Sequence, residues 1–401
     1  MPAFYKEWFW KTKLSLMSKV LLKPQPKPVV FVGANSALDL CSTMAQFGLD
    51  NILIVTDKPL RELGVIDPII NSLNSKGVAT HVYDGVLPDP TQKVVDDGLA
   101  VLRQNTCSGV LAVGGGSSID ASKAIALAGG NGGLAADVVG VQKCKLPALP
   151  FFAIPTTAGT GSEGTFIAVI SDNETHQKGA IIDAKIIPRA AALDPIIMKG
   201  LPPHITAATG MDALTHAIES YIGLWETEDT NFYGLTACKL IFENLREACS
   251  NGENLAAREA MALASYYGGL AITNALVGYV HAVSHNLGAK YGVPHGLGNA
   301  LALPHVLELL KDASAEKMAD IAVHCGFGDR SEGASTLAQK LIDQVWALNT
   351  DIGIPKTTDV IQSDDIDGLV YIMMAEGSSY PTPRFFERDE MIKLLNDLQA
   401  E

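Results

Sequence analysis

The chain has 401 residues, of which 47% are hydrophobic and 18% charged, a composition typical of a compact globular protein rather than a disordered or fibrous one. Its formal net charge of -14, without any run of basic residues, excludes nucleic acid as an expected partner because a polyanion would be repelled. This length is about twice that of a usual domain, so more than one domain is expected.

The six cysteines are scattered and form no CxxC pair. This pattern predicts reduced thiols, a cytoplasmic location and no thiolate metal site. No stretch reaches the roughly 18 uncharged apolar residues of a transmembrane helix.

Residues 1–23 form an aromatic and basic extension, and a proline-rich linker follows up to residue 28. The extension contains Trp8 and Trp10, and five lysines stand against one glutamate. It lacks the apolar core and cleavage site of a secretory signal. Two interpretations stay open: a helix docked on its own body or on a sister subunit, or a segment at a membrane interface that would give peripheral membrane association.

From residue 29 to 200, short apolar segments alternate with segments of helical pattern. This alternation predicts an α/β domain whose parallel sheet is covered by helices on both faces. We expect strands at 29–32, 51–56, 78–83, 109–113 and 150–154, and helices at 36–47, 66–76, 91–104 and 117–128.

From residue 201 to 401, long segments rich in Ala, Leu and Met predict an all-helical domain. Expected helices lie at 204–224, 230–249, 255–274, 276–291, 296–310, 314–325 and 333–350.

Two glycine-rich turns follow strands of the first domain, GGGSSID at 114–120 and PTTAGTGSE at 155–163. Glycines allow close approach of a phosphate, and the helix that begins near Ser117 offers free N–H groups and a favourable dipole. In the second turn, Thr156, Thr157 and Thr160 add hydroxyl groups. Both turns lie at the carboxyl ends of strands, where an open α/β sheet binds its ligand, so we expect a dinucleotide there.

Asp57 ends the strand ILIVT and is a candidate to accept hydrogen bonds from a ribose 2′-hydroxyl, which would favour NAD over NADP. A turn aspartate that caps a helix or loop is the alternative. The fingerprint GxGxxG is absent, so the arrangement differs from the common dinucleotide-binding one.

Histidine is rare, yet His281, His285 and His295 fall within fifteen residues of one another. Gly292 and Pro294 should end the helix that carries the first two and redirect His295. Asp212 and His216 form another pair four residues apart, which places both on one helix face. Together they predict a site for one divalent cation. Imidazole and carboxylate donors suit Fe²⁺ or Zn²⁺, and the residues alone do not choose between them.

The motifs GGGSSID, PTTAGTGSE, GMDALTHAIE and GYVHAVSHNLGAKYGVPHG resemble those of the iron-containing (group III) alcohol dehydrogenase family, over about residues 29–395. The resemblance implies an α/β nucleotide-binding domain followed by an all-α domain, as in dehydroquinate synthase. It implies metal ligation by Asp212, His216, His281 and His295, and it places His285 near the nicotinamide as a proton relay. The implied cofactor contacts are Asp57, Gly114, Gly115, Gly116, Ser117, Thr156, Thr157, Thr160 and Lys178.

The expected activity is that of an NAD(H)-dependent oxidoreductase that interconverts a small or medium primary alcohol and its aldehyde, with Fe²⁺ as the expected metal and Zn²⁺ as the alternative. A homodimer or higher homo-oligomer is expected. The rival assignments are a polyol- or lactaldehyde-type dehydrogenase, a lyase similar to dehydroquinate synthase and, from a third class, a non-catalytic structural protein.

Overall fold

The computed structural model describes residues 25–175 and 177–400, so the predicted N-terminal extension lies outside the described residues. The chain divides into two compact units. The α/β unit comprises residues 25–201 together with 253–269, and the helical unit comprises 202–252 and the described part of 270–401.

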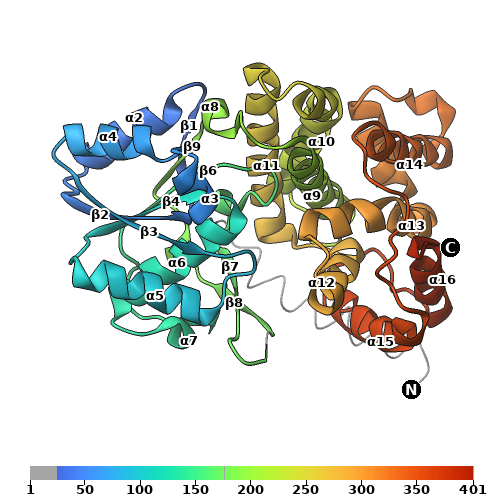
Figure 1. Cartoon of the computed structure of the whole chain (residues 1–401). Coiled ribbons are helices and arrows are strands. Elements are labelled where there is room, and N and C mark those ends of the chain that lie inside the picture. Colours follow the sequence, from blue (N-terminus) through green and yellow to red (C-terminus); the bar gives the residue numbers. More distant parts are fainter. Residues whose placement is uncertain (1–24, 176, 401) are drawn as a thin grey trace. The chain divides into compact units, whose positions relative to one another are not determined.

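The α/β unit is built on a parallel sheet, as the alternating pattern predicted. Within the described residues this sheet has six strands in the order β1, β9, β6, β4, β2, β3 (Figure 1). Their bounds are β1 (Val29–Val32), β2 (Asn51–Asp57), β3 (Ala79–Val86), β4 (Gly109–Gly114), β6 (Phe151–Pro155) and β9 (Ala190–Leu193). The central strands β4 and β6 contain no polar side chain, because both faces of the sheet are covered.

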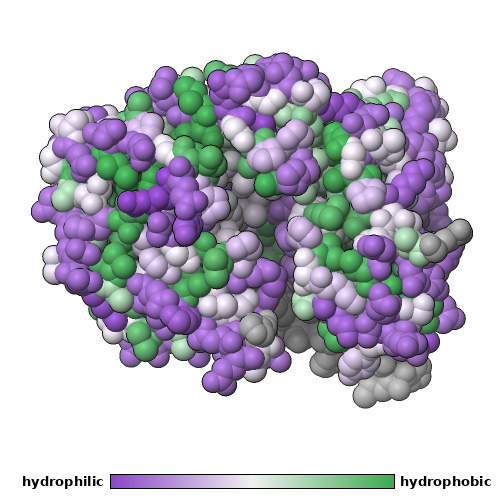
Figure 2. Space-filling model, viewed as in Figure 1, coloured by the Kyte–Doolittle hydropathy of each residue, from purple (hydrophilic) through white to green (hydrophobic). Residues whose placement is uncertain are grey.

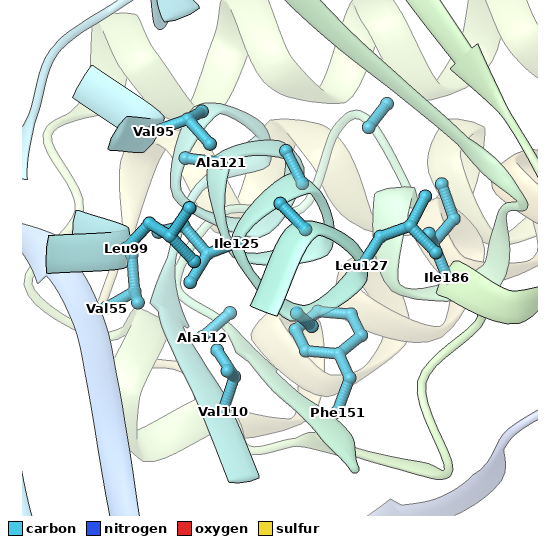
Figure 3. Close-up of a cluster of buried hydrophobic side chains, with 14 of the residues drawn as sticks. Val55, Val95, Leu99, Val110, Ala112, Ala121, Ile125, Leu127, Phe151 and Ile186 are labelled. Atoms are coloured by element: carbon cyan, nitrogen blue, oxygen red, sulfur yellow. The ribbon is translucent and has the colours of Figure 1, made fainter. Parts of the chain in front are cut away.

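Alternate side chains of each strand enter two separate cores. On β2, Ile52 and Ile54 pack in the core that includes α2 (Ser36–Gln46) and α4 (Asp67–Ser75). Leu53 and Val55 pack on the opposite face, against α5 (Gln92–Gln104) and α6 (Gly116–Asn131). Figure 3 shows this second core, with Ile125 of α6 beside Leu99 of α5. The helices thereby hold the carboxyl ends of the strands, where both glycine-rich turns begin.

Several short elements were not predicted. A second sheet, with order β5-β8-β7, is formed by β5 (Gly140–Val141), β7 (Ile167–Ser171) and β8 (Lys178–Ile182). The strand β9 has the sequence AAAL, and alanine is depleted in strands, so its pairing depends on tertiary contacts instead of local preference. Short helices α3 (Lys58–Glu62), α7 (Ala135–Val138) and α8 (Pro195–Met198) complete the unit.

The second half of the chain is helical, as predicted. Its helices are α9 (Pro203–Ile222), α10 (Glu228–Ser250), α11 (Leu255–Ala275), α12 (Tyr279–Tyr291), α13 (His295–His324), α14 (Ala334–Asp351), α15 (Ile366–Gly377) and α16 (Arg388–Leu398). The two helices expected at 296–310 and 314–325 are joined in α13, which is interrupted only by the non-helical backbone of Ser314.

Hydrophilic residues occupy much of the face shown in Figure 2, and the hydrophobic ones on it form small, separate patches. Among the described helices none alone has the length and hydropathy to cross a bilayer; only the bent pair α11 and α12 meets those criteria jointly, on length and composition.

Candidate functional site

Helix α9 places two of the predicted metal ligands on one buried face. Prolines at 202 and 203 suit its first turn, where a backbone N–H has no intrahelical partner. Asp212 and His216 are four residues apart, and their exposed fractions are 2% and 4%. Both side chains therefore point into the helical unit.

The segment between α12 and α13 brings two further histidines to the same point. Gly292 ends α12 in the left-handed conformation with φ 71°, which favours glycine. Pro294 then directly precedes α13, whose first residue is His295. The predicted break between His281 and His295 is thus confirmed, and the two side chains reach the site from different helices.

The donor atoms of Asp212, His216, His281 and His295 all lie within 4.8 Å of one another. From Asp212 Oδ1 the Nε2 atoms lie at 3.3 Å for His295, 3.7 Å for His216 and 3.9 Å for His281. Atoms bonded to one ion at about 2.1 Å are separated by about 3–4 Å, so the donor set fits a single divalent cation. Imidazole and carboxylate groups without thiolates agree with Fe²⁺ or Zn²⁺.

The electrostatics of the cluster favour the protonation states that metal binding requires. Burial alone would raise the pKa of Asp212, but the imidazoles of His216, His295 and His281 hold that pKa well below its usual range. Burial, together with His216, His295 and His285, lowers the pKa of His281 well below its usual value. A charged carboxylate and a neutral imidazole are the ligand forms of these side chains.

Glu219 supports the site and was not singled out from the sequence. It lies seven residues after Asp212 on α9 and is 5% exposed. His281 Nδ1 lies 2.7 Å from its Oε2, and the N–H groups of Gly278 and Val280 donate to Oε2 and Oε1 at 2.8 Å. When the ring proton of His281 is on Nδ1 and is donated to Glu219, Nε2 is left as the donor to a cation. The two backbone bonds to Glu219 hold the start of α12. In the sequence, the spacing of seven residues between Asp212 and Glu219 was the feature that could have identified Glu219 as part of the site.

His285 lies beside the cluster without belonging to it. Its ring stacks on His295 with centroids 5.2 Å apart. Its Nδ1 lies 2.7 Å from Oε1 of Glu376. The same carboxylate accepts a hydrogen bond from Tyr380 at Oε1 and one from Asn286 at Oε2. Glu376 belongs to α15, far along the chain, and sequence spacing gave no sign of it. The side chains of His285 and His295 are 31% and 35% exposed, so the cluster is open on this side.

The two glycine-rich turns of the α/β unit lie against each other. Gly114 pairs with Pro155, and the N–H of Thr156 donates to the carbonyl of Gly114 at 3.0 Å. A Cβ atom on Gly116 would lie 2.6 Å from Cγ2 of Thr160, so the turns pack too closely for a side chain there. Because α6 begins at Gly116, its first N–H groups point out of this bare backbone. The arrangement fits a phosphate group of a dinucleotide.

A buried lysine fixes the second turn to α6, and the sequence did not suggest it. Lys123 is 0% exposed, and its Nζ donates to Ser162 Oγ, Thr165 Oγ1 and the Ile167 carbonyl at 2.9, 2.8 and 2.7 Å. Ser162 in turn donates to Asp120 Oδ1 at 2.6 Å. All three ammonium protons are therefore used within the α/β unit.

The remaining predicted cofactor residues have structural roles as well. Asp57 Oδ1 accepts from the N–H of Leu60 at 2.9 Å, so this side chain caps α3. Ser117 is the second residue of α6. Lys178 begins β8, and its ammonium lies 3.0 Å from Asp89 Oδ1. Contact of these three residues, and of the two glycine-rich turns, with a cofactor stays a prediction.

Comparison with known proteins covers both units. A family model described as "Iron-containing alcohol dehydrogenase" matches residues 26–195, and one described as "Fe-containing alcohol dehydrogenase family, C-terminal" matches residues 206–399. The 1,3-propanediol dehydrogenase of Klebsiella pneumoniae is 40% identical over 362 residues, which cover 89% of this chain and 93% of the relative. The NAD-dependent methanol dehydrogenase of Bacillus methanolicus is 35% identical over 372 residues, 92% of this chain and 98% of the relative. A crystal structure of 1,3-propanediol oxidoreductase has a TM-score of 0.90 and 37% identity, and the match covers 94% of this chain and 99% of that one.

Proposed function

Because the chain belongs to the iron-containing alcohol dehydrogenase family, we propose that it interconverts a small or medium primary alcohol and its aldehyde, with NAD(H) as cofactor and Fe²⁺ as metal. The observation that carries this proposal is the cluster of Asp212, His216, His281 and His295. Four side chains from three helices converge in one buried place, and no packing requirement alone would collect three imidazoles around a carboxylate.

A divalent cation held by these residues would supply Lewis-acid polarisation of the alcohol or aldehyde oxygen, and a nicotinamide would supply the hydride acceptor or donor. The residues of the chain would hold the cation and the cofactor and orient the metal ligands. Asp212 contributes the negative charge of the donor set, and Glu219 keeps Nε2 of His281 directed at the cation. In the α/β unit, the backbone of Gly114 to Gly116 would hold a phosphate of the cofactor.

His285 is proposed to take up the proton that the alcohol releases. When Nδ1 of its ring donates to Glu376 Oε1, 2.7 Å away, Nε2 is the basic atom and accepts the proton. The exposed sides of His285 and His295 mark the direction from which a small substrate reaches the donor set.

The substrate assignment draws on two relatives, a 1,3-propanediol dehydrogenase and an NAD-dependent methanol dehydrogenase. Both act on short alcohols, which supports a short-chain alcohol here. The cytoplasmic location and the homo-oligomer stay predictions. For the metal, Zn²⁺ binds such donors more tightly than Fe²⁺, so the ion in a purified sample depends on supply.

The test is a screen of NADH oxidation against aldehydes of increasing length, with metal analysis of the same anaerobically purified sample. His281→Ala should lose the cation and the activity. It should retain NADH binding, because the substitution leaves the two glycine-rich turns unchanged. His204→Ala is the matched control, since His204 is exposed on α9 and outside the cluster. Full turnover by a metal-free His281→Ala protein would falsify the proposal.

A further inference from the structure

An asparagine lies among the donor atoms of the metal cluster. Asn299 is on α13, four residues after His295, and is 0% exposed. Its Nδ2 lies 2.7 Å from Asp212 Oδ1 and 3.3 Å from Nε2 of both His281 and His295. Its Oδ1 is buried and has no hydrogen-bond partner among the described residues.

We propose that Asn299 is a positioning residue of the metal centre, which donates a hydrogen bond to the ligand oxygen of Asp212 and so fixes the rotation of that carboxylate. The inference rests on the proposed function, because it assumes that the four clustered side chains bind a cation. It concerns the residue's effect on metal affinity and geometry, not contact with the substrate.

The number of lone pairs decides which of the three short contacts survives metal binding. Nε2 of a neutral imidazole has one lone pair, which the cation takes, so the contacts of Asn299 with His281 and His295 cannot remain hydrogen bonds. A carboxylate oxygen has two lone pairs and can serve the cation and the amide together. The bond from Asn299 to Asp212 is therefore the one that persists, and its charged acceptor makes it stronger than a neutral bond.

The orientation of the amide follows from the same contact. With its oxygen and nitrogen exchanged, Oδ1 of Asn299 would lie 2.7 Å from Asp212 Oδ1, and two acceptors would face each other. The donating orientation leaves Asn299 Oδ1 buried without a partner among the described residues, which is unfavourable for a polar atom. If the residue at this position only filled space, an apolar side chain would do so without an unpaired buried oxygen.

The helical unit provides a matched control in Asn349 on α14. This side chain is 3% exposed, its Nδ2 donates to the carbonyl of Ala300 at 2.8 Å, and its Oδ1 also has no partner in the described chain. It is thus a buried amide of the same kind with a backbone acceptor in place of Asp212. Loss of Asn349 reports the general effect of removing a buried amide from this unit.

The experiment compares the full-length wild type, Asn299→Leu, Asn299→Ala and Asn349→Leu, each stripped of metal and titrated with Co²⁺ and Zn²⁺ against a chelator. The measured quantities are the dissociation constants, the metal stoichiometry and the visible absorption spectrum of the Co²⁺ form, which reports ligand geometry. We expect both Asn299 variants to bind about 10–100-fold more weakly with an altered Co²⁺ spectrum, and Asn349→Leu to bind as the wild type does.

Three results would overturn the inference. Wild-type affinity and spectrum in either folded Asn299 variant would show that the amide does not position Asp212. An equal loss of affinity in Asn349→Leu would show that the effect is general. Failure of the wild type to bind any divalent cation would instead remove the proposed metal centre, and the inference with it; the wild-type titration distinguishes this case from the first two.

Discussion

Replacement of Lys123 by methionine tests how the second glycine-rich turn is held. Methionine has a similar length and no charge, so Lys123→Met removes the hydrogen bonds to Ser162, Thr165 and Ile167 while it fills the space. Hydrogen bonds of a charged donor contribute about 1.5–3 kcal/mol each, so their loss costs about 5–9 kcal/mol in total.

A second effect opposes this loss. Burial lowers the pKa of Lys123 from 10.5 to about 8, which means that the site disfavours the charged form by about 3 kcal/mol relative to water. Methionine relieves that cost. The loss of the three bonds is therefore partly offset, and we expect a net destabilisation of about 3–5 kcal/mol, the size found when one partner is removed from a buried pair.

Urea denaturation followed by circular dichroism measures this difference as a lower midpoint for Lys123→Met. The matched control is Lys93→Met, because the Lys93 side chain is 71% exposed and its pair with Asp97 is on the surface. That control should differ from the wild type by less than about 1 kcal/mol. Equal midpoints for the two variants would refute the assigned role of the three hydrogen bonds.

Two further predictions concern single carboxylates of the α/β unit. Burial raises the pKa of Glu163 from 4.5 to about 7, so the folded chain keeps a proton there that the unfolded chain releases. The resulting stability is complete below pH 4.5 and is lost, by up to about 3 kcal/mol, as the pH rises to about 7. Glu163→Gln should flatten the change of the urea midpoint between pH 5 and pH 7, and an unchanged slope would contradict the prediction. Asp57→Gly should relax the preference for NAD over NADP, measured as the ratio of kcat/KM values. It should lower the free energy of unfolding by only a few tenths of a kcal/mol, because glycine also suits the start of α3. An unchanged ratio would leave Asp57 as a helix cap only.

The residues that sequence analysis identified are those whose chemistry follows from local spacing. Asp212 and His216 are one helical turn apart, and the conformations of Gly292 and Pro294 are dictated by their own backbones. Both features act within a few residues, so spacing alone indicated clustered metal ligands, whereas the choice of His281 and His295 over His285 came from the family resemblance. The main sheet was predicted for the same reason, since its central strands are short apolar runs between helices.

The missed residues act over long sequence separations. Asn299 and Asp212 are 87 residues apart, and Glu376 and His285 are 91 residues apart. Lys123 reads as an ordinary helical lysine until the fold brings Thr165 and Ile167 to its ammonium. The strand β9, composed mainly of alanine, likewise depends on its neighbours β1 and β6. Such features depend on tertiary packing, which no local pattern encodes.

The junction between α12 and α13 also limits how the chain can change in length. His281 and His295 meet because a fixed number of residues carries the backbone from one helix, through Gly292 and Pro294, to the next. One residue inserted or deleted within α12 after His281 would rotate all that follows by about 100° around the helix axis. His295 would then leave the cluster although every ligand was still present, so the spacing of this segment is as restricted as the identity of the ligands.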